Sequence, residues 1–422
     1  MTQLKIAVTG AAGRMGRIYA PEFVKQGHDV RVFDLNRTAL YGLYNGSEAK
    51  MLHTNRDLVK DADVVLLFTP VPQTEKVLKE MSKYMQENVI LGSAASAKEI
   101  VAEYELKYAP QSARIVEFHP MHGENIKPEG QNLIIVPVRD FIYEGREAKD
   151  ILADLFSPTK AKIRHIKSPK DHDTLMCEIQ GGNHLLALNI ATGWHLCDVD
   201  PDTICNNESP MYNAKSLYAR RPISLNLEVY VTTILGNKNV APYIEQYSDI
   251  FSDICEKVIE GEKKVLYDMF SGIKEHLGMD EIERVGKVWK SIYGDNFNGI
   301  QNSNLSLFAF RELQRIRGVK PTDFIDYESP HYFFSRMILY GSMNEDAHNV
   351  IDNAIHNPKI RLRDFNYARA FAIVNQIVQS GDEKTLLSHL YRLKKFYNSE
   401  KMQRNLDVVR RESINEADKF RR

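Results

Sequence analysis

The stretch L-K-I-A-V-T-G-A-A-G-R-M-G-R-I-Y-A, Leu4 to Ala20, decides how the chain begins to fold. It consists of an apolar run typical of a strand, a glycine-rich turn and a helical pattern. Gly10, Gly13 and Gly16 let the backbone turn tightly and let a pyrophosphate approach N–H groups at the positive end of the helix. The spacing is G-x-x-G-x-x-G, with Ala11 where the usual G-x-G-x-x-G fingerprint has a glycine, so the turn alone also fits an ordinary strand-to-helix connection.

A second apolar run, Asp29 to Phe33, ends at Asp34, about twenty residues after the turn. A carboxylate at this place can accept hydrogen bonds from an adenosine ribose, and it would repel the extra phosphate of NADP. This favours NAD as the cofactor, although Arg37 could instead bind that phosphate, which keeps NADP as the alternative. The other cofactor-binding candidates lie in the glycine turn or after a later strand: Arg14, Met15, Thr69 and Pro70.

Over the first 165 residues, short apolar runs alternate with helical patterns. This alternation predicts an α/β fold with a mostly parallel, doubly wound, Rossmann-like sheet. The expected strands cover residues 4–8, 29–33, 64–68, 89–91, 114–117 and 133–138, with helices over 74–84 and 97–108. Because ligands bind outside the carboxyl ends of such strands, we expect the glycine turn, the loops after residues 68 and 91, and His119 to meet at one crevice.

His119 follows the expected strand that ends at Glu117, so we expect its side chain to face the crevice. An imidazole with a pKa near neutrality is suited to take or hold a proton while a hydroxyl becomes a carbonyl. A purely structural role for this histidine is the alternative.

The composition is that of a soluble enzyme. A chain of 422 residues is long enough for two or three domains, and its net charge of −1 predicts neither a nucleic-acid partner nor an anionic membrane partner. Its apolar runs are too short to cross a bilayer. The four cysteines, Cys177, Cys197, Cys205 and Cys255, lack C-x-x-C spacing, so we expect neither a disulfide framework nor a metal site. A reduced, cytoplasmic location follows.

From about residue 171 helical patterns take over, and they repeat. The motif V-x-P followed by E-S-P-x-Y occurs at residues 199–212 and again at 319–332, a shift of 120 positions. The same shift relates Asn237 to Asn357, Tyr247 to Tyr367, Phe251 to Phe371, Gly261 to Gly381, Lys264 to Lys384 and Leu266 to Leu386. We predict a dinucleotide-binding domain over 1–168, a helical module over 169–290, and a second copy with a charged tail over 291–422. Two copies would bury their apolar faces against each other. The alternative is that the helices are unrelated and that these motifs match by chance.

The chain resembles the prephenate dehydrogenases. The resemblance rests on G-x-x-G-x-M-G-R at 10–17, S-A-K at 96–98, H-P-M-x-G at 119–123, H-D at 172–173 and I-Q-x-x-x-H at 179–184. The sequence H-x-x-H-G followed by E-G-Q, with the doubled helical region, is most similar to the long fungal-type branch. The resemblance implies oxidative decarboxylation of prephenate to 4-hydroxyphenylpyruvate in tyrosine biosynthesis, with hydride transfer to a nicotinamide.

By the family pattern, His119 would hydrogen-bond the ring hydroxyl, and Ser96 would orient the same hydroxyl or the histidine. His184, on the first long helix of the helical region, would reach the crevice from the other side. A helix N-cap is the alternative role for Ser96, and a packed or solvated histidine is the alternative for His184. His122 stands at a variable position of its motif, and His172 could cap or orient a helix between the domains.

One departure bears on the substrate. Prephenate is a dianion, and short family members place an arginine on the helix after S-P-x-Y to pair with a carboxylate. Here residues 209–212 are followed by Asn213. Arg220, Arg221 or Arg336 could replace that arginine, with surface charge as their alternative role. The choice among prephenate, arogenate and a related cyclohexadienyl acid therefore stays open.

The resemblance also bears on assembly. Short family members pair their helical domains between two subunits, so a chain with both copies could form this interface internally, as a pseudo-dimer that is a monomer or a homodimer. Two other functions remain. The chain could be another β-hydroxyacid or carbinol dehydrogenase, and its opening is also similar to that of dihydrodipicolinate reductases. It could also be a catalytically idle NAD-binding sensor or scaffold.

Overall fold

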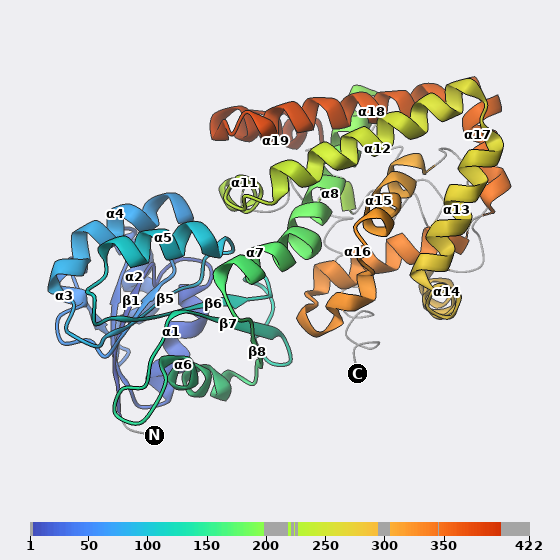
Figure 1. The fold of residues 1–422 in the computed structure, drawn as a ribbon. Coiled ribbons are helices and arrows are strands. Elements are labelled where there is room, and N and C mark those ends of the chain that lie inside the picture. The colour runs from blue at the N-terminus through green and yellow to red at the C-terminus, as the bar shows by residue number, and fades with distance from the viewer. Residues whose placement is uncertain are drawn as a thin grey trace. The chain divides into compact units, whose positions relative to one another are not determined.

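The computed structural model describes residues 3–197, 218–220, 223, 227–293, 304–344 and 346–397. The chain divides into two units, Met1–Met176 and Cys177–Arg422 (Figure 1). The sequence predicted a border after residue 168. In the structure the first unit extends to Met176 and includes helix α7, Pro169–Met176. Among the described helices, none is long and apolar enough to cross a membrane.

The first unit is built on one eight-stranded sheet with the order β3-β2-β1-β4-β5-β6-β7-β8. Neighbouring strands are parallel except β6 and β7, which are antiparallel, so the predicted mostly parallel sheet is confirmed. The strands are β1 (Lys5–Thr9), β2 (Asp29–Phe33), β3 (Lys50–Met51), β4 (Val64–Leu67), β5 (Ile90–Ser93), β6 (Arg114–Pro120), β7 (Asn132–Arg139) and β8 (Lys162–His165). Strands β3 and β8, at the two edges, were not predicted.

Helices cover both faces of this sheet (Figure 1). They are α1 (Gly16–Lys25), α2 (Arg37–Tyr44), α3 (Asn55–Leu58), α4 (Val71–Met81), η1 (Ser82–Tyr84), α5 (Lys98–Tyr108), α6 (Ala148–Phe156), η2 (Ser157–Thr159) and α7. Side chains alternate along β1, so Ile6 and Val8 pack in one core with α1, α2 and α6, while Ala7 packs in a second core with α3 and α4. Apolar residues on both faces explain why these strands are continuous hydrophobic runs.

The described part of the second unit is helical. A π-helical turn, η3 (Cys177–Gly181), leads into α8 (Gly182–Leu196). The other elements are α11 (Leu227–Leu235), α12 (Val240–Glu260), α13 (Lys263–Leu277), α14 (Met279–Tyr293), α15 (Leu305–Ile316), η4 (Pro321–Tyr327), α16 (Pro330–Gly341), η5 (Ser342–Asn344), α17 (Ala347–His356), α18 (Pro358–Gln379) and α19 (Glu383–Tyr397).

The helix bounds follow the 120-residue shift seen in the sequence. Moved along by that shift, α13 coincides with α19, and α8, α11 and α12 fall on α15, α17 and α18 within about three residues at each end. Features near the helix ends recur as well: Asn237 and Asn357 each accept a hydrogen bond from the N–H two residues later, and Gly261 and Gly381 both have a positive φ.

The two sets of helices pack reciprocally. Helix α12 packs against α15 as α18 packs against α8, and α13 packs against α17 as α19 packs against α11. In a twofold-symmetric interface every contact occurs twice in this manner. One continuous core joins both sets.

Candidate active site

The glycine turn after β1 is closely packed. Gly10 has a φ of +74°, and a Cβ built on it would lie 2.6 Å from the carbonyl oxygen of Phe68. A Cβ on Gly16 would lie 2.3 Å from the oxygen of Gly10, and one on Gly13 would lie 3.0 Å from the same oxygen. Because no side chain fits at Gly10 or Gly16, the turn has the close backbone approach that a dinucleotide phosphate site needs.

Two charged side chains follow the carboxyl end of β2. The Asp34 carboxylate accepts hydrogen bonds from the N–H groups of Ala12 (3.0 Å) and Asn36 (2.8 Å), which fixes it beside the glycine turn. The Arg37 guanidinium donates to the carbonyl oxygen of Leu52 (2.6 Å) and lies 4.6 Å from the ring centre of Phe33. A carboxylate and a guanidinium therefore both follow β2, where we expect a ribose or its 2′-phosphate to be recognised.

The remaining cofactor candidates lie around the same turn. Arg14 is exposed and pairs with Glu124 (3.2 Å), and Met15 is the N-cap residue of α1. The Thr69 hydroxyl lies 3.3 Å from that of Thr74, and Pro70 is the N-cap residue of α4. A cofactor role for these four side chains stays a prediction.

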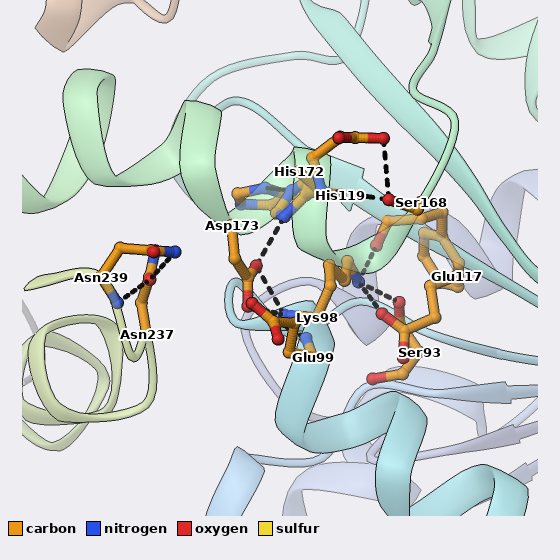
Figure 2. A network of polar contacts seen from close by, with 12 residues as sticks. Ser93, Lys98, Glu99, Glu117, His119, Ser168, His172, Asp173, Asn237 and Asn239 are labelled. Atoms are coloured by element: carbon orange, nitrogen blue, oxygen red, sulfur yellow. Dashed lines mark hydrogen bonds and ion pairs between the residues drawn. The ribbon is translucent and has the colours of Figure 1, made fainter.

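His119 lies inside β6 rather than after it, as the last residue but one of that strand. His119 is 3% exposed, so it is buried rather than open to solvent, and its place at a substrate crevice stays a prediction. The strand predicted from the sequence ended at Glu117, three residues before the end of β6 at Pro120. Nδ1 of His119 lies 3.0 Å from Nε2 of His172, on α7 (Figure 2). From the sequence, His172 was predicted only to cap or orient a helix, and the H-D pair was the only motif that pointed to it.

The next residue, Asp173, connects His172 to the start of α5. Nδ1 of His172 lies 2.8 Å from Oδ1 of Asp173. The same carboxylate accepts hydrogen bonds from the N–H groups of Lys98 (2.8 and 3.1 Å) and Glu99 (2.9 Å) (Figure 2). It thus satisfies the first N–H groups of α5 in the way a capping side chain does. We call His119, His172 and Asp173 the histidine–aspartate array.

Because Asp173 caps α5, Ser96 does not. The N-cap residue of α5 is Ala97, so the alternative of an N-cap role for Ser96 was wrong. Ser96 is half-buried in the segment between β5 and α5. Its expected contact with a substrate hydroxyl or with the histidine stays a prediction.

Both histidines of the array are neutral. Burial lowers the pKa of His119 well below its usual value, and the neighbouring His172, Lys98 and His122 lower it further. Burial lowers the pKa of His172 in the same way, and the Lys98 ammonium adds to this. The expectation of a pKa near neutrality for His119 was therefore wrong, because a cation at that depth would lose its hydration.

A buried lysine supports the strand that carries His119. Lys98 is fully buried, donates to the carbonyl oxygens of Ser93 (2.7 Å) and Phe118 (2.8 Å), and pairs with Glu117 (3.2 Å). Burial raises the pKa of Glu117 to about 7, and Lys98 opposes this rise. Burial also raises the pKa of Glu105. The sequence contained Lys98 within S-A-K, but nothing there showed that its ammonium would tie β5 to β6.

Both ring nitrogens of His122 form hydrogen bonds within the first unit. Its Nδ1 lies 3.0 Å from the carbonyl oxygen of Gly123, so this nitrogen carries the proton, and the Tyr19 hydroxyl donates to Nε2 at 2.8 Å. Burial lowers its pKa.

The other predicted residues belong to the second unit. His184 lies on α8, three residues after the π-helical turn, and its half-buried ring stacks on Tyr230 with centres 4.5 Å apart. Its role in a crevice stays a prediction. Arg220 is buried, whereas Arg221 and the first S-P-x-Y motif lie outside the described residues. Arg336 is buried in ion pairs with Glu328 (3.0 Å) and Glu281 (3.1 Å). Two carboxylates already neutralise it, so it is a poor candidate for binding a substrate carboxylate.

The chain is similar in sequence to known proteins. A family model described as prephenate dehydrogenase, nucleotide-binding domain, matches residues 41–164, which include β6 and His119. The chain is also similar to a probable prephenate dehydrogenase (NADP(+)) of Schizosaccharomyces pombe, with 24% identity over 288 residues. Residues 41–164 are therefore similar to the nucleotide-binding domain of prephenate dehydrogenases. The match covers 68% of this chain and 62% of the fission yeast protein, so it spans less than two thirds of that relative's length.

A second fungal relative is the prephenate dehydrogenase (NADP(+)) of Saccharomyces cerevisiae, 22% identical over 75% of this chain and 73% of the yeast protein. Both fungal names specify NADP(+), whereas the sequence favoured NAD here. Among solved structures, that of prephenate dehydrogenase from A. aeolicus with hydroxyphenyl propionate and NAD+ is 16% identical, with a TM-score of 0.49 over 64% of this chain and 95% of that one.

Proposed function

We propose that this chain is a nicotinamide-dependent dehydrogenase that converts prephenate to 4-hydroxyphenylpyruvate and carbon dioxide. The observation that supports this most directly is His119 near the end of β6, which burial keeps neutral and whose Nδ1 contacts His172 of the H-D pair of α7. It lies within residues 41–164, which are similar to the nucleotide-binding domain of prephenate dehydrogenases, and two fungal relatives of the chain bear this name.

A neutral imidazole suits the first half of this reaction. A bound nicotinamide would supply the acceptor for the hydride that leaves the carbinol carbon. His119 accepts a hydrogen bond from the hydroxyl on that carbon and draws its proton away as the carbonyl forms. Loss of carbon dioxide then leaves its bonding electrons in the ring, which becomes aromatic, and the proton returns from His119 to the phenol oxygen. No proton is gained or lost overall.

Substrate contact requires a local rearrangement. With 3% of its surface exposed, the His119 ring can meet a hydroxyl only after the groups that cover it move aside. Ser96, which is half-buried and follows β5, is the proposed partner of the same hydroxyl. His184 and Arg220 are the proposed contacts from the helical unit, with Arg220 pairing with a carboxylate of the substrate.

The glycine turn fits the pyrophosphate of a dinucleotide, because the backbone at Gly10 and Gly16 is packed so closely that a Cβ would clash with other backbone atoms. Such a turn without side chains lets a phosphate approach the backbone N–H groups. Asp34 and Arg37 would choose between the two coenzymes. The carboxylate of Asp34 disfavours a 2′-phosphate, and the guanidinium of Arg37 favours one. Since Asp34 is held by two N–H groups beside the turn, we expect it to dominate and NAD to be preferred.

The direct test supplies prephenate and arogenate separately, each with NAD and with NADP, and follows the reduced cofactor. We expect turnover of prephenate, and its loss in His119→Asn with coenzyme affinity unchanged. His165→Asn is the matched control, because His165 is exposed on β8 of the same unit. Turnover of arogenate alone would reassign the substrate, and full activity of His119→Asn would remove His119 from the chemistry.

We further propose that each chain is a pseudo-dimer with one active site. The reciprocal packing of α12 on α15 and of α18 on α8 supports this, because a chain that pairs its own two modules needs no second chain for that interface. Light scattering should give the mass of one chain, and titration should give one coenzyme per chain. A stable dimer would show that additional surfaces associate. The cytoplasmic location stays a prediction.

A further inference from the structure

The histidine–aspartate array has one consistent arrangement of protons. The Asp173 carboxylate accepts hydrogen bonds from two backbone N–H groups, those of Lys98 and Glu99, at the positive end of α5. A carboxylate in that position is ionised and can only accept. Nδ1 of His172, 2.8 Å from Oδ1 of Asp173, must therefore carry a proton.

The remaining positions follow from the inventory of a neutral imidazole, which has one N–H donor and one acceptor nitrogen. With its proton on Nδ1, His172 accepts at Nε2. The contact of 3.0 Å with His119 then requires a proton on Nδ1 of His119. The lone pair of His119 is consequently on Nε2.

We infer that His172 and Asp173 are positioning residues that fix the tautomer of His119 and present its Nε2 as the only acceptor for the substrate hydroxyl. The inference deepens the proposed function and rests on it, because a tautomer matters only if His119 takes part in the chemistry. It requires no contact of His172 or Asp173 with the substrate.

The surroundings make the array rigid. His172 and Asp173 are fully buried, and three elements meet at them: β6 with His119, α7 with the H-D pair, and the start of α5. The Lys98 ammonium binds the carbonyl oxygen of Phe118, the residue before His119. The array therefore orders an acid, an orienting imidazole and a reacting imidazole, as the aspartate and histidine are ordered in a serine protease triad.

The first test is Asp173→Asn. The amide oxygen of Asn can still accept from the start of α5, so the cap is retained. Its NH₂ group, however, can only donate to Nδ1 of His172, which moves the proton of His172 to Nε2 and that of His119 to Nε2 as well. We expect kcat for prephenate to fall roughly 10²- to 10⁴-fold, as for the wrong tautomer in a protease triad, with KM and coenzyme affinity little changed.

The tautomer can be observed without turnover. In protein carrying ¹⁵N-labelled histidine, two-bond ¹H–¹⁵N spectra distinguish the protonated nitrogen from the lone-pair nitrogen, and the His119 signals are those missing in His119→Asn. We expect Nδ1 to be protonated in the wild type and Nε2 in Asp173→Asn. Asp171→Asn is the matched control, because it removes the same charge from an exposed position of the same helix.

A second pair of variants guards against misfolding. His172→Gln places an amide oxygen near the position of Nε2, where it can accept the Nδ1 proton of His119, whereas His172→Leu offers no acceptor. We expect Gln to keep the wild-type tautomer and to exceed Leu in kcat by about tenfold or more. Equal activity of the two variants would contradict the inference.

The inference and the proposed function can fail separately. If prephenate is not oxidised, or if His119→Asn is fully active, the proposed function fails, and the spectra still test the tautomer. If the wild type carries the His119 proton on Nε2, or if Asp173→Asn keeps both the tautomer and the kcat of the wild type, the positioning role is overturned.

Discussion

Phe251 and Phe371, which the 120-residue shift relates, contact each other with ring centres 4.9 Å apart and an interplanar angle of 77°. Tyr247 also lies with its ring centre 4.3 Å from that of Phe371, at 89°. A residue that contacts its own counterpart lies near the axis relating two copies. These rings therefore mark the centre of the interface between α12 and α18.

The first prediction concerns this centre. Phe371→Ala should lower the free energy of unfolding by about 3 to 5 kcal/mol, because it removes a fully buried ring at the edge-to-face contacts. Denaturation in urea measures the change. Leu362→Ala is the control on the same helix, since Leu362 is 62% exposed and should cost less than about 0.5 kcal/mol. Equal costs for the two variants would place Phe371 away from the interface centre.

The second prediction concerns the glycine turn. Gly16→Ala should weaken coenzyme binding by about tenfold or more, because its Cβ would lie 2.3 Å from the oxygen of Gly10 and must displace the turn. Gly42→Ala is the control, because Gly42 lies on a helix with nothing within 4 Å of a new Cβ. Fluorescence titration gives the dissociation constants. Wild-type affinity in Gly16→Ala would locate the nucleotide elsewhere.

The third prediction concerns coenzyme choice. Asp34→Asn keeps an acceptor for the N–H groups of Ala12 and Asn36 but removes the charge that repels a 2′-phosphate. The KM for NADP relative to that for NAD should fall by about tenfold. Arg37→Ala should move the ratio in the opposite direction. A ratio that neither substitution changes would show that other groups recognise the ribose.

The fourth prediction concerns pH and a buried histidine of α19. Burial lowers the pKa of His389 to about 4, and its Nε2 lies 2.9 Å from the Thr192 hydroxyl. An unfolded histidine has a pKa of about 6.5. Because the folded-state value is the lower one, the neutral side chain contributes stability fully above pH 6.5, and this contribution is lost as the pH falls toward 4. The loss amounts to roughly 3 kcal/mol.

Unfolding in urea at pH 7 and pH 4.5 tests this sign. His389→Gln should lose less stability than the wild type over that interval, because it has no proton to take up when it unfolds. His356→Gln, at an exposed position, should follow the wild type. The other titrating groups are common to all three proteins and cancel in the comparison. A steeper loss in His389→Gln would reverse the assignment.

The sequence was informative wherever the deciding pattern is local. The strand and helix alternation, the glycine turn with Asp34 after β2, and the 120-residue shift are all written as periods and spacings along the chain. Such patterns depend on backbone geometry and on the face that each element buries, which neighbouring residues specify among themselves.

Contacts between distant residues were not predictable in this way. Only the folded chain brings Asp173 to the start of α5, 75 residues earlier, and His172 to His119, 53 residues earlier. Only the folded structure shows that Arg336 pairs with Glu328 and Glu281, which makes it a poor candidate for binding a substrate carboxylate.

The sequence by itself determined the order of the elements, the position of the glycine turn and the 120-residue shift between helical patterns. The tertiary structure decided the protonation and the tautomer of the candidate catalytic side chains. Burial sets the pKa of His119, and the partner at Nδ1 sets its tautomer. Both depend on which elements pack together, because desolvation and hydrogen-bond geometry arise from the atoms around a side chain in space rather than from its neighbours along the chain.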